Sequence, residues 1–287
     1  MVDLWREKFS SQIICRFRII VYFLKGMVTE MKIGIIGTGI IASAVVTGLC
    51  KAKTGHEFFL SPRNADRAAA LAGEFPNVSV CSSNQQVVDK AEWIFICLLK
   101  KDFGALSELK YRSEQSIINM SAEMRLPELK EIVGETANLA HVIPLPFIAS
   151  GFGPLLIYPN NKIIGKIFEP VSDVYYADKQ EDVHTLQIIT CMMSAYYMLL
   201  NEVVKFSDER KIEHDTSVGF VSSLFGSLCR RAAETPDCDL VELAHEMTPG
   251  GYNEQAMNIL MDNGAIGAWR TALDKMLHRL QQSGDDA

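Results

Sequence analysis

Short apolar runs alternate with stretches of helical spacing along the chain from Met31 to residue 177. The run MKIGIIG at 31–37 is apolar almost throughout, which is typical of a strand that is buried on both faces. Strands that alternate with helices predict βαβ units and therefore an α/β fold with a doubly wound parallel sheet. The runs that predict its strands are 31–37, 56–61, 78–80, 93–99, 116–121 and 139–143, with 154–159 and 171–177 at its edge.

Strand-like runs stop near Asp178, and the remainder of the chain has helical spacing only. We therefore expect two domains, a sheet domain over 31–177 and an all-α dimerisation and substrate domain over 178–287. The helices of the second domain are apolar on more than one face. So small a domain cannot bury all of this apolar surface by itself. We accordingly expect a homodimer or a larger homo-oligomer, with an active site between the sheet domain of one chain and helices of both. The predicted helices are 181–204, 207–233, 237–246, 253–263 and 264–282.

Residues 1–30 follow neither pattern. Their apolar run at 13–24 contains Arg16 and Arg18, and no small-residue cleavage site follows it, which argues against a secretory signal peptide. We expect a poorly ordered extension, and an amphipathic helix on a membrane surface is the alternative. The chain has no uninterrupted run of about 18 uncharged apolar residues, so we expect no stable membrane insertion.

The composition narrows the class of protein. With 48% hydrophobic residues and a net charge of −7, the chain is too apolar to be disordered and too acidic for nucleic-acid binding as a main role. Its 7 cysteines are odd in number and scattered, without a Cys-x-x-Cys pair. We therefore expect neither a disulfide framework nor a metal site, and we expect a cytoplasmic location.

A glycine-rich turn joins the first predicted strand to the helix after it. The segment GTGIIA at 37–42 has the pattern G-x-G-x-x-A, in which the first glycine permits a tight turn and the second lets the backbone approach a diphosphate. The amino end of the following helix offers N–H groups to the phosphates. This placement predicts a Rossmann-type dinucleotide-binding domain. The predicted cofactor contacts in the turn are Gly37, Thr38, Gly39, Ile40 and Ile41.

The end of the second predicted strand indicates which dinucleotide binds. An NAD-selecting site has an acidic residue here that binds the ribose hydroxyls, whereas this strand ends in SPRN at 61–64. Arg63 can form two parallel hydrogen bonds to a 2′-phosphate, and Ser61 and Asn64 can donate further ones. The sequence therefore predicts NADP(H) as the cofactor. The alternative is a solvated turn in which Asn64 only caps the next helix.

A second glycine loop, TPGGYN at 248–253, precedes a predicted helix in the second domain. Two consecutive glycines ahead of a helix can form a concave nest of N–H groups that suits a small carboxylate. With the first loop, this motif resembles the pyrroline-5-carboxylate reductase family, in which a Rossmann domain precedes a helical dimerisation domain. The resemblance covers about 31–280. Its further motifs are 34–49, Arg63-Asn64, Asn84, 94–100, Pro144, Ala195-Tyr196 and 247–257.

The resemblance implies an oxidoreductase that acts on CH–NH bonds. Its reaction in that family is the NADPH-dependent reduction of 1-pyrroline-5-carboxylate to L-proline, a step of proline biosynthesis. The resemblance also implies that Asn84, together with the loop Cys97, Leu98 and Leu99, flanks the nicotinamide half of the cofactor.

Around the substrate, the resemblance implies that Asn253 donates a hydrogen bond to the ring nitrogen and that Tyr252 is a proton donor or a lid. Both residues replace threonines of the family, and its Gly-Ser-Gly-Pro-Ala-Tyr appears here as CMMSAY at 191–196. The alternatives are therefore an imine or keto-acid reductase with another substrate, a deazaflavin-dependent NADP oxidoreductase, and a non-catalytic NADPH-binding regulator. The residues that would surround the substrate carboxylate are Thr248, Pro249, Gly250 and Gly251.

Overall fold

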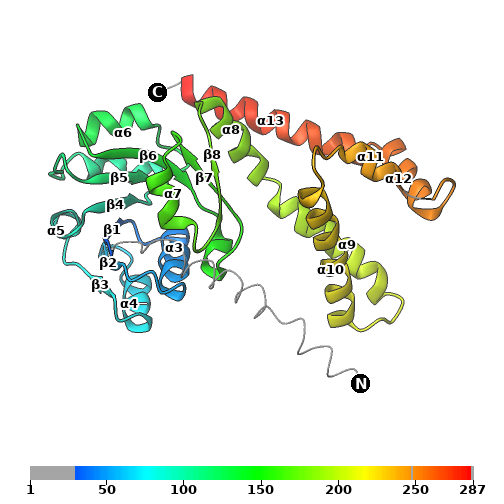
Figure 1. Ribbon diagram of the computed structural model, residues 1–287, viewed down its shortest axis with the longest axis horizontal. Helices are drawn as coiled ribbons and strands as arrows, with labels where there is room; N and C mark the ends of the chain where they lie inside the picture. Colours follow the sequence, from blue (N-terminus) through cyan, green and yellow to red (C-terminus); the bar gives the residue numbers. More distant parts are fainter. Residues whose placement is uncertain (1–29, 247, 286–287) are drawn as a thin grey trace. The chain divides into compact units, whose positions relative to one another are not determined.

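The computed structural model of the chain describes residues 30–246 and 248–285. The chain divides into two compact units, the first ending at Gln180 and the second beginning at Glu181 (Figure 1). The first unit is an α/β domain, and the second is helical throughout its described residues. This architecture confirms the predicted fold class. The extension predicted at 1–30 lies outside the described residues except for Glu30.

A sheet of eight strands forms the centre of the first unit. Its strands are β1 (Lys32–Ile36), β2 (Glu57–Leu60), β3 (Val78–Val80), β4 (Trp93–Ile96), β5 (Ser116–Asn119), β6 (Asn138–Ile143), β7 (Pro154–Tyr158) and β8 (Asp173–Tyr176). They lie in the order β3-β2-β1-β4-β5-β6-β7-β8, and β1 to β6 are parallel. Strand β7 is antiparallel to β6, and β8 is parallel to β7. The strands predicted at the edge therefore run opposite to the others, which the short connection between β6 and β7 permits.

Helices cover both faces of the sheet (Figure 1). They are α3 (Ile40–Lys51), α4 (Ala65–Glu74), α5 (Asn84–Lys90), α6 (Leu126–Val133) and α7 (Lys162–Phe168), with short 3-10 helices η1 (Lys100–Leu106) and η2 (Pro146–Ser150). Buried side chains of α3, α4 and α7 form one apolar cluster, and those of α5, α6 and η1 form another. In the first cluster the rings of Phe95 and Phe168 are 5.8 Å apart, and both are fully buried. Because β1 to β6 are parallel, their carboxyl ends lie at one edge of this packed sheet.

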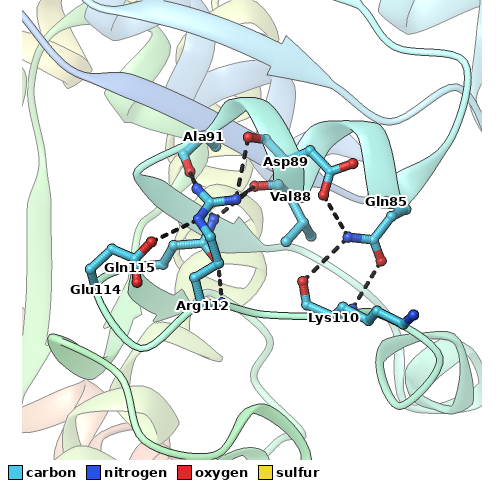
Figure 2. Close-up of polar contacts among 8 residues, drawn as sticks. All are labelled: Gln85, Val88, Asp89, Ala91, Lys110, Arg112, Glu114 and Gln115. Atoms are coloured by element: carbon cyan, nitrogen blue, oxygen red, sulfur yellow. Dashed lines mark hydrogen bonds and ion pairs between the residues drawn. The ribbon is translucent and has the colours of Figure 1, made fainter.

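The segment before β5 holds the carboxyl end of α5 in place. The guanidinium of Arg112 donates to the carbonyl oxygens of Val88 and Ala91, at 3.3 and 3.0 Å, and Gln115 donates to the same two oxygens (Figure 2). These carbonyl groups lie at a helix end, where intrahelical partners are lacking. Gln85 binds the backbone of Lys110 through both its amide oxygen and its amide nitrogen (Figure 2). Helix α5 is thus fixed at both ends of its length.

Gly48 is required by the contact between α3 and η2. A methyl group at this position would overlap the carbonyl oxygen of Ile148, which is backbone and cannot rotate away. We expect Gly48→Ala to lower the stability of the first unit by roughly 1–3 kcal/mol because the helix must move. Gly73→Ala is the matched control, since a methyl group there meets nothing within 4 Å. Thermal unfolding should show a lower midpoint for the first variant only, and equal midpoints would contradict this account.

The second unit consists of α8 (Gln180–Thr190), α9 (Met193–Asp208), α10 (His214–Glu234), α11 (Leu240–His245), α12 (Tyr252–Asp262) and α13 (Ala265–Asp285). The single helix predicted at 181–204 is in fact two helices, α8 and α9. The backbone N–H groups of Cys191 and Met192 bond to carbonyl oxygens three residues earlier, which tightens the chain between the two helices. Neither Gly nor Pro marks this break, so the periodicity of the sequence does not reveal it.

Helices α8 and α9 form the most apolar stretch of the second unit. By length and composition alone, Gln180–Asp208 could cross a membrane, and 11% of its apolar window is buried within the chain. Those two criteria are weak evidence for a membrane span, because an interface between two protein chains has the same apolar character.

Candidate functional site

The glycine turn lies between β1 and α3, as its pattern predicts. Gly37 has a φ of +95°, and a Cβ there would lie 2.6 Å from the carbonyl oxygen of Cys97. A side chain is therefore excluded by both conformation and space. Gly39 is the N-cap of α3, and a Cβ there would meet nothing within 4 Å. The backbone is thus packed against other atoms of the protein at Gly37, whereas the turn is open at Gly39, where the neighbouring space is empty. This empty space suits a ligand phosphate at the amino end of α3.

Ser61 and Thr38 hold this turn from the side of β2. The hydroxyl of Ser61 accepts a hydrogen bond of 2.9 Å from the N–H of Gly37, and Thr38 donates its own hydroxyl to the carbonyl oxygen of Ser61 at 3.2 Å. Both side chains are buried. The Ser61 hydroxyl, which the sequence places at the adenosine end of the cofactor, thus also holds the glycine turn, through the register of β1 and β2. Its contact with the cofactor stays a prediction.

Arg63 lies in the turn after β2 and forms an ion pair with Asp102 in η1, at 2.8 Å between Nη1 and Oδ2. The side chain of Arg63 is 61% exposed and that of Asp102 is 17% exposed. The next residue, Asn64, occupies the N-cap position of α4 but makes no capping hydrogen bond through its side chain. Asn64 therefore stands at the predicted N-cap position, without the side-chain hydrogen bond of a capping residue.

The residues assigned to the nicotinamide half follow β3 and β4 at the same edge of the sheet. Asn84 is the first residue of α5, directly after the capping residue Ser83. Leu98 is buried and Leu99 is exposed. Burial raises the pKa of the Cys97 thiol to about 12, and its sulfur lies 3.8 Å from that of Met120. The thiol stays protonated at neutral pH and is not a nucleophile.

The second glycine loop precedes α12, as predicted, with Gly251 at the N-cap and a φ of +70° at Gly250. The N–H of Gly250 donates to the carboxylate of Glu254, and that of Gly251 donates to the carbonyl oxygen of Thr248 at 2.9 Å. The chain's own groups thus use the two N–H donors that the sequence assigns to a substrate carboxylate. Glu254 stands three residues after the N-cap, which is the spacing of a capping box, but its carboxylate accepts from the residue before the N-cap and not from the N-cap itself.

A cavity of about 240 Å³ lies beside this loop and is lined by Ala244, His245, Pro249 and Glu254. The side chain of Tyr252 is 90% exposed. Glu254 therefore borders the cavity while its carboxylate holds the loop. Among residues 30–246 and 248–285, no group of three side chains from His, Cys, Asp and Glu could hold a metal ion.

A polar cluster joins α9 to α10 elsewhere in the second unit. His214 and Asp208 form a hydrogen bond of 2.9 Å, which raises the pKa of the His214 imidazole and lowers that of the Asp208 carboxyl. The hydroxyl of Ser207 donates to that of Ser217 at 2.6 Å. These contacts fix the turn between the helices, so they have a structural role.

Known proteins resemble this chain in the part that contains the glycine turn. Residues 32–123 match the family described as "NADP oxidoreductase coenzyme F420-dependent". ComE operon protein 4 of Bacillus subtilis is 26% identical over 119 residues, which cover 40% of this chain and 43% of that protein. The chain thus spans less than half the length of this curated relative.

Solved structures match over far more of the chain. Pyrroline-5-carboxylate reductase of Streptococcus pyogenes matches with a TM-score of 0.77 and 19% identity, over 88% of this chain and 99% of that one. The NADP-bound pyrroline carboxylate reductase of Plasmodium falciparum matches with a TM-score of 0.75 and 18% identity, over 90% and 100%. A reductive aminase of Aspergillus terreus matches with a TM-score of 0.52 and 13% identity, over 90% and 95%.

The chain therefore has the Rossmann-type fold of NAD(P)-dependent oxidoreductases, followed by a helical unit. More particularly, its fold is that of the pyrroline-5-carboxylate reductases, and the resemblance seen in its motifs is confirmed at the level of the fold.

Proposed function

We propose that this protein reduces cyclic imines with NADPH and that 1-pyrroline-5-carboxylate, which yields L-proline, is its leading substrate. The observation that carries the proposal is the glycine turn, open at Gly39 and flanked by Arg63 without an acidic residue at the end of β2. This turn belongs to a fold that matches pyrroline-5-carboxylate reductases over nearly their whole length.

The first unit supplies the groups that would hold NADP(H). The open backbone at Gly39 and the first N–H groups of α3 suit the diphosphate, and the exposed guanidinium of Arg63 suits a 2′-phosphate. Asn64, which makes no capping bond, is available to the same phosphate. When bound, this cofactor supplies a hydride.

The second unit supplies the groups proposed for the imine. A protonated imine is already electrophilic, so the protein has mainly to hold the reacting carbon in place and to exclude water. We assign Asn253 as the hydrogen-bond donor to the ring nitrogen and Tyr252 as a lid or proton donor. Thr248, Pro249 and the glycine pair would surround the carboxylate of the substrate.

Turnover tests the proposal directly. The purified protein mixed with NADPH and 1-pyrroline-5-carboxylate should lose the near-ultraviolet absorbance of the reduced nicotinamide. A panel of cyclic imines and 2-keto acids separates this reaction from that of a related reductase. NADPH binding without turnover on any member of the panel would overturn the reductase proposal and favour a regulator.

The hydrogen bond between Glu254 and the second glycine loop favours a second candidate function, that of an imine reductase whose substrate lacks a carboxylate. A carboxylated substrate must compete with Glu254 for the N–H of Gly250, and the two negative charges repel each other. We expect Glu254→Gln to lower the KM for 1-pyrroline-5-carboxylate roughly fivefold and to leave that for 1-pyrroline unchanged. Asp262→Asn, the same charge change at the other end of α12, is the control. An equal effect on both substrates would contradict competition at this loop.

We also propose that the protein is a homodimer or larger homo-oligomer. Helix α9 has a single buried residue, Val204, although it is rich in apolar side chains. On α10, Phe220 is 71% exposed. The exposed apolar side chains of these two helices include Tyr197, Met198, Leu199, Phe206, Val218, Phe220, Leu224 and Leu228.

So many exposed apolar side chains on two helices are typical of an obligate interface between subunits. Sedimentation at micromolar concentration should therefore give at least twice the chain mass of 32.0 kDa. Phe220→Asp should shift the protein toward the monomer because it places a charge in the interface. Phe152→Asp, at an exposed phenylalanine of the first unit, should not. A wild-type monomer would refute this part of the proposal.

A further inference from the structure

The ion pair between Arg63 and Asp102 lies across the proposed dinucleotide site. Arg63 follows β2 and Asp102 lies in η1, which follows β4. In the sheet, β1 lies between these two strands. Because all three strands are parallel, their carboxyl ends meet at one edge, and the pair bridges over the end of β1 where the glycine turn begins.

The two partners differ in how they are held. The carboxylate of Asp102 is mostly buried, whereas most of the Arg63 side chain is exposed. The N–H of Asp102 also donates to the carbonyl oxygen of Leu99 at 2.9 Å, which ties this residue to the chain leaving β4. Asp102 is therefore the anchored partner, and Arg63 is the one that can reorient toward a ligand.

Asp102 supplies a carboxylate beside the end of β2, although β2 itself ends without an acidic residue. A Rossmann site that takes an unphosphorylated dinucleotide has a carboxylate near the end of its second strand, which accepts hydrogen bonds from the ribose hydroxyls. This strand ends without one, but the fold brings a carboxylate from η1 to within 2.8 Å of the guanidinium at that position. The adenosine end of the site thus has both a cation that suits a 2′-phosphate and an anion that suits a ribose diol.

We infer that Asp102 is a specificity-determining residue that weakens the preference for NADPH over NADH. The inference rests on the proposed function, since it requires a dinucleotide in this site. The carboxylate occupies one edge of the Arg63 guanidinium and repels a 2′-phosphate. With an unphosphorylated cofactor, the same carboxylate accepts hydrogen bonds from the hydroxyl groups. The protein therefore binds both dinucleotides, with a modest preference for the phosphorylated one.

The wild-type protein provides the first test, through dissociation constants measured by fluorescence titration with NADPH and with NADH. The expected ratio of the two constants is about tenfold or less. If NADPH binds and NADH binds more than about a hundredfold more weakly, the inference is overturned while the proposed function stands. If neither dinucleotide binds, the proposed function fails and the inference fails with it.

The second test is Asp102→Asn, which removes the charge and keeps the size of the side chain. We expect the dissociation constant to fall roughly fivefold for NADPH and to rise roughly fivefold for NADH. Asp66→Asn is the matched control, because Asp66 lies in the first turn of α4 and has the same charge. Unchanged constants, or equal changes in the control, would show that the pairing with Arg63 has no part in selection.

Discussion

Arg63→Glu should weaken NADPH binding by about a hundredfold and leave NADH binding within about threefold of the wild type. The side chain of Arg63 is largely exposed in the turn after β2, and β2 is paired with β1, which leads into the glycine turn. The substitution removes its charge-assisted hydrogen bonds to the 2′-phosphate and replaces the attraction with repulsion. NADH has no 2′-phosphate, so its affinity does not depend on this charge.

Arg67→Glu is the control for this result. It makes the same charge reversal on the exposed surface of α4, one helical turn from Arg63. Titration of each variant with both dinucleotides, at one fixed salt concentration, separates a local contact from a general change in charge. Equal losses of NADPH and NADH affinity in Arg63→Glu would defeat the assignment of this residue to the 2′-phosphate.

Asn253→Ala should lower kcat by about 30- to 100-fold and change KM much less. In the proposed reaction, the nitrogen of the protonated imine gains a lone pair as the carbon receives the hydride, and the amide of Asn253 donates to this lone pair. The hydrogen bond is therefore stronger in the transition state than in the ground state, and its loss affects mainly kcat. Asn253 lies in the first turn of α12, so its position is set by the glycine pair before it.

Asn258→Ala supplies the comparison, since it removes the same side chain from an exposed position on the same helix. Tyr252→Phe answers a separate question, because it removes the hydroxyl and keeps the ring. A lid should tolerate that change within about threefold, whereas a proton donor should lose kcat as strongly as the Asn253 variant does. If Asn253→Ala changes only KM, the residue binds substrate without taking part in the chemical step.

The structure also explains why some sequence predictions were right and others were wrong. The strands and the glycine turn depend on short-range signals, namely apolar runs and glycines at fixed spacing, so they were predictable. The break between α8 and α9 depends on two backbone hydrogen bonds at Cys191 and Met192, which have no residue signature. The reversed direction of β7 depends on its pairing with β6, and that pairing is tertiary.

The site residues divide in the same way. The places of Arg63, Asn64 and the glycines beside strands and helices were predictable, because each follows from neighbouring residues, and their roles toward cofactor and substrate stay predictions. The acid that pairs with Arg63 was not identifiable, because Asp102 lies far along the chain and is brought near by the register of β2, β1 and β4. A capping box would have placed the Glu254 carboxylate on the N–H of Gly251, whereas it accepts from Gly250, so its competition with a substrate carboxylate depends on the loop conformation.

By itself, the sequence determined the order of the elements, the dinucleotide turn and the glycine pair before α12, because each is encoded within a few neighbouring residues. Only the tertiary structure decided that the Ser61 hydroxyl holds Gly37, that Asp102 pairs with Arg63, and that Glu254 binds the loop. The physical reason is that polar selectivity depends on distances of about 3 Å between side chains, and only the packed fold defines such distances.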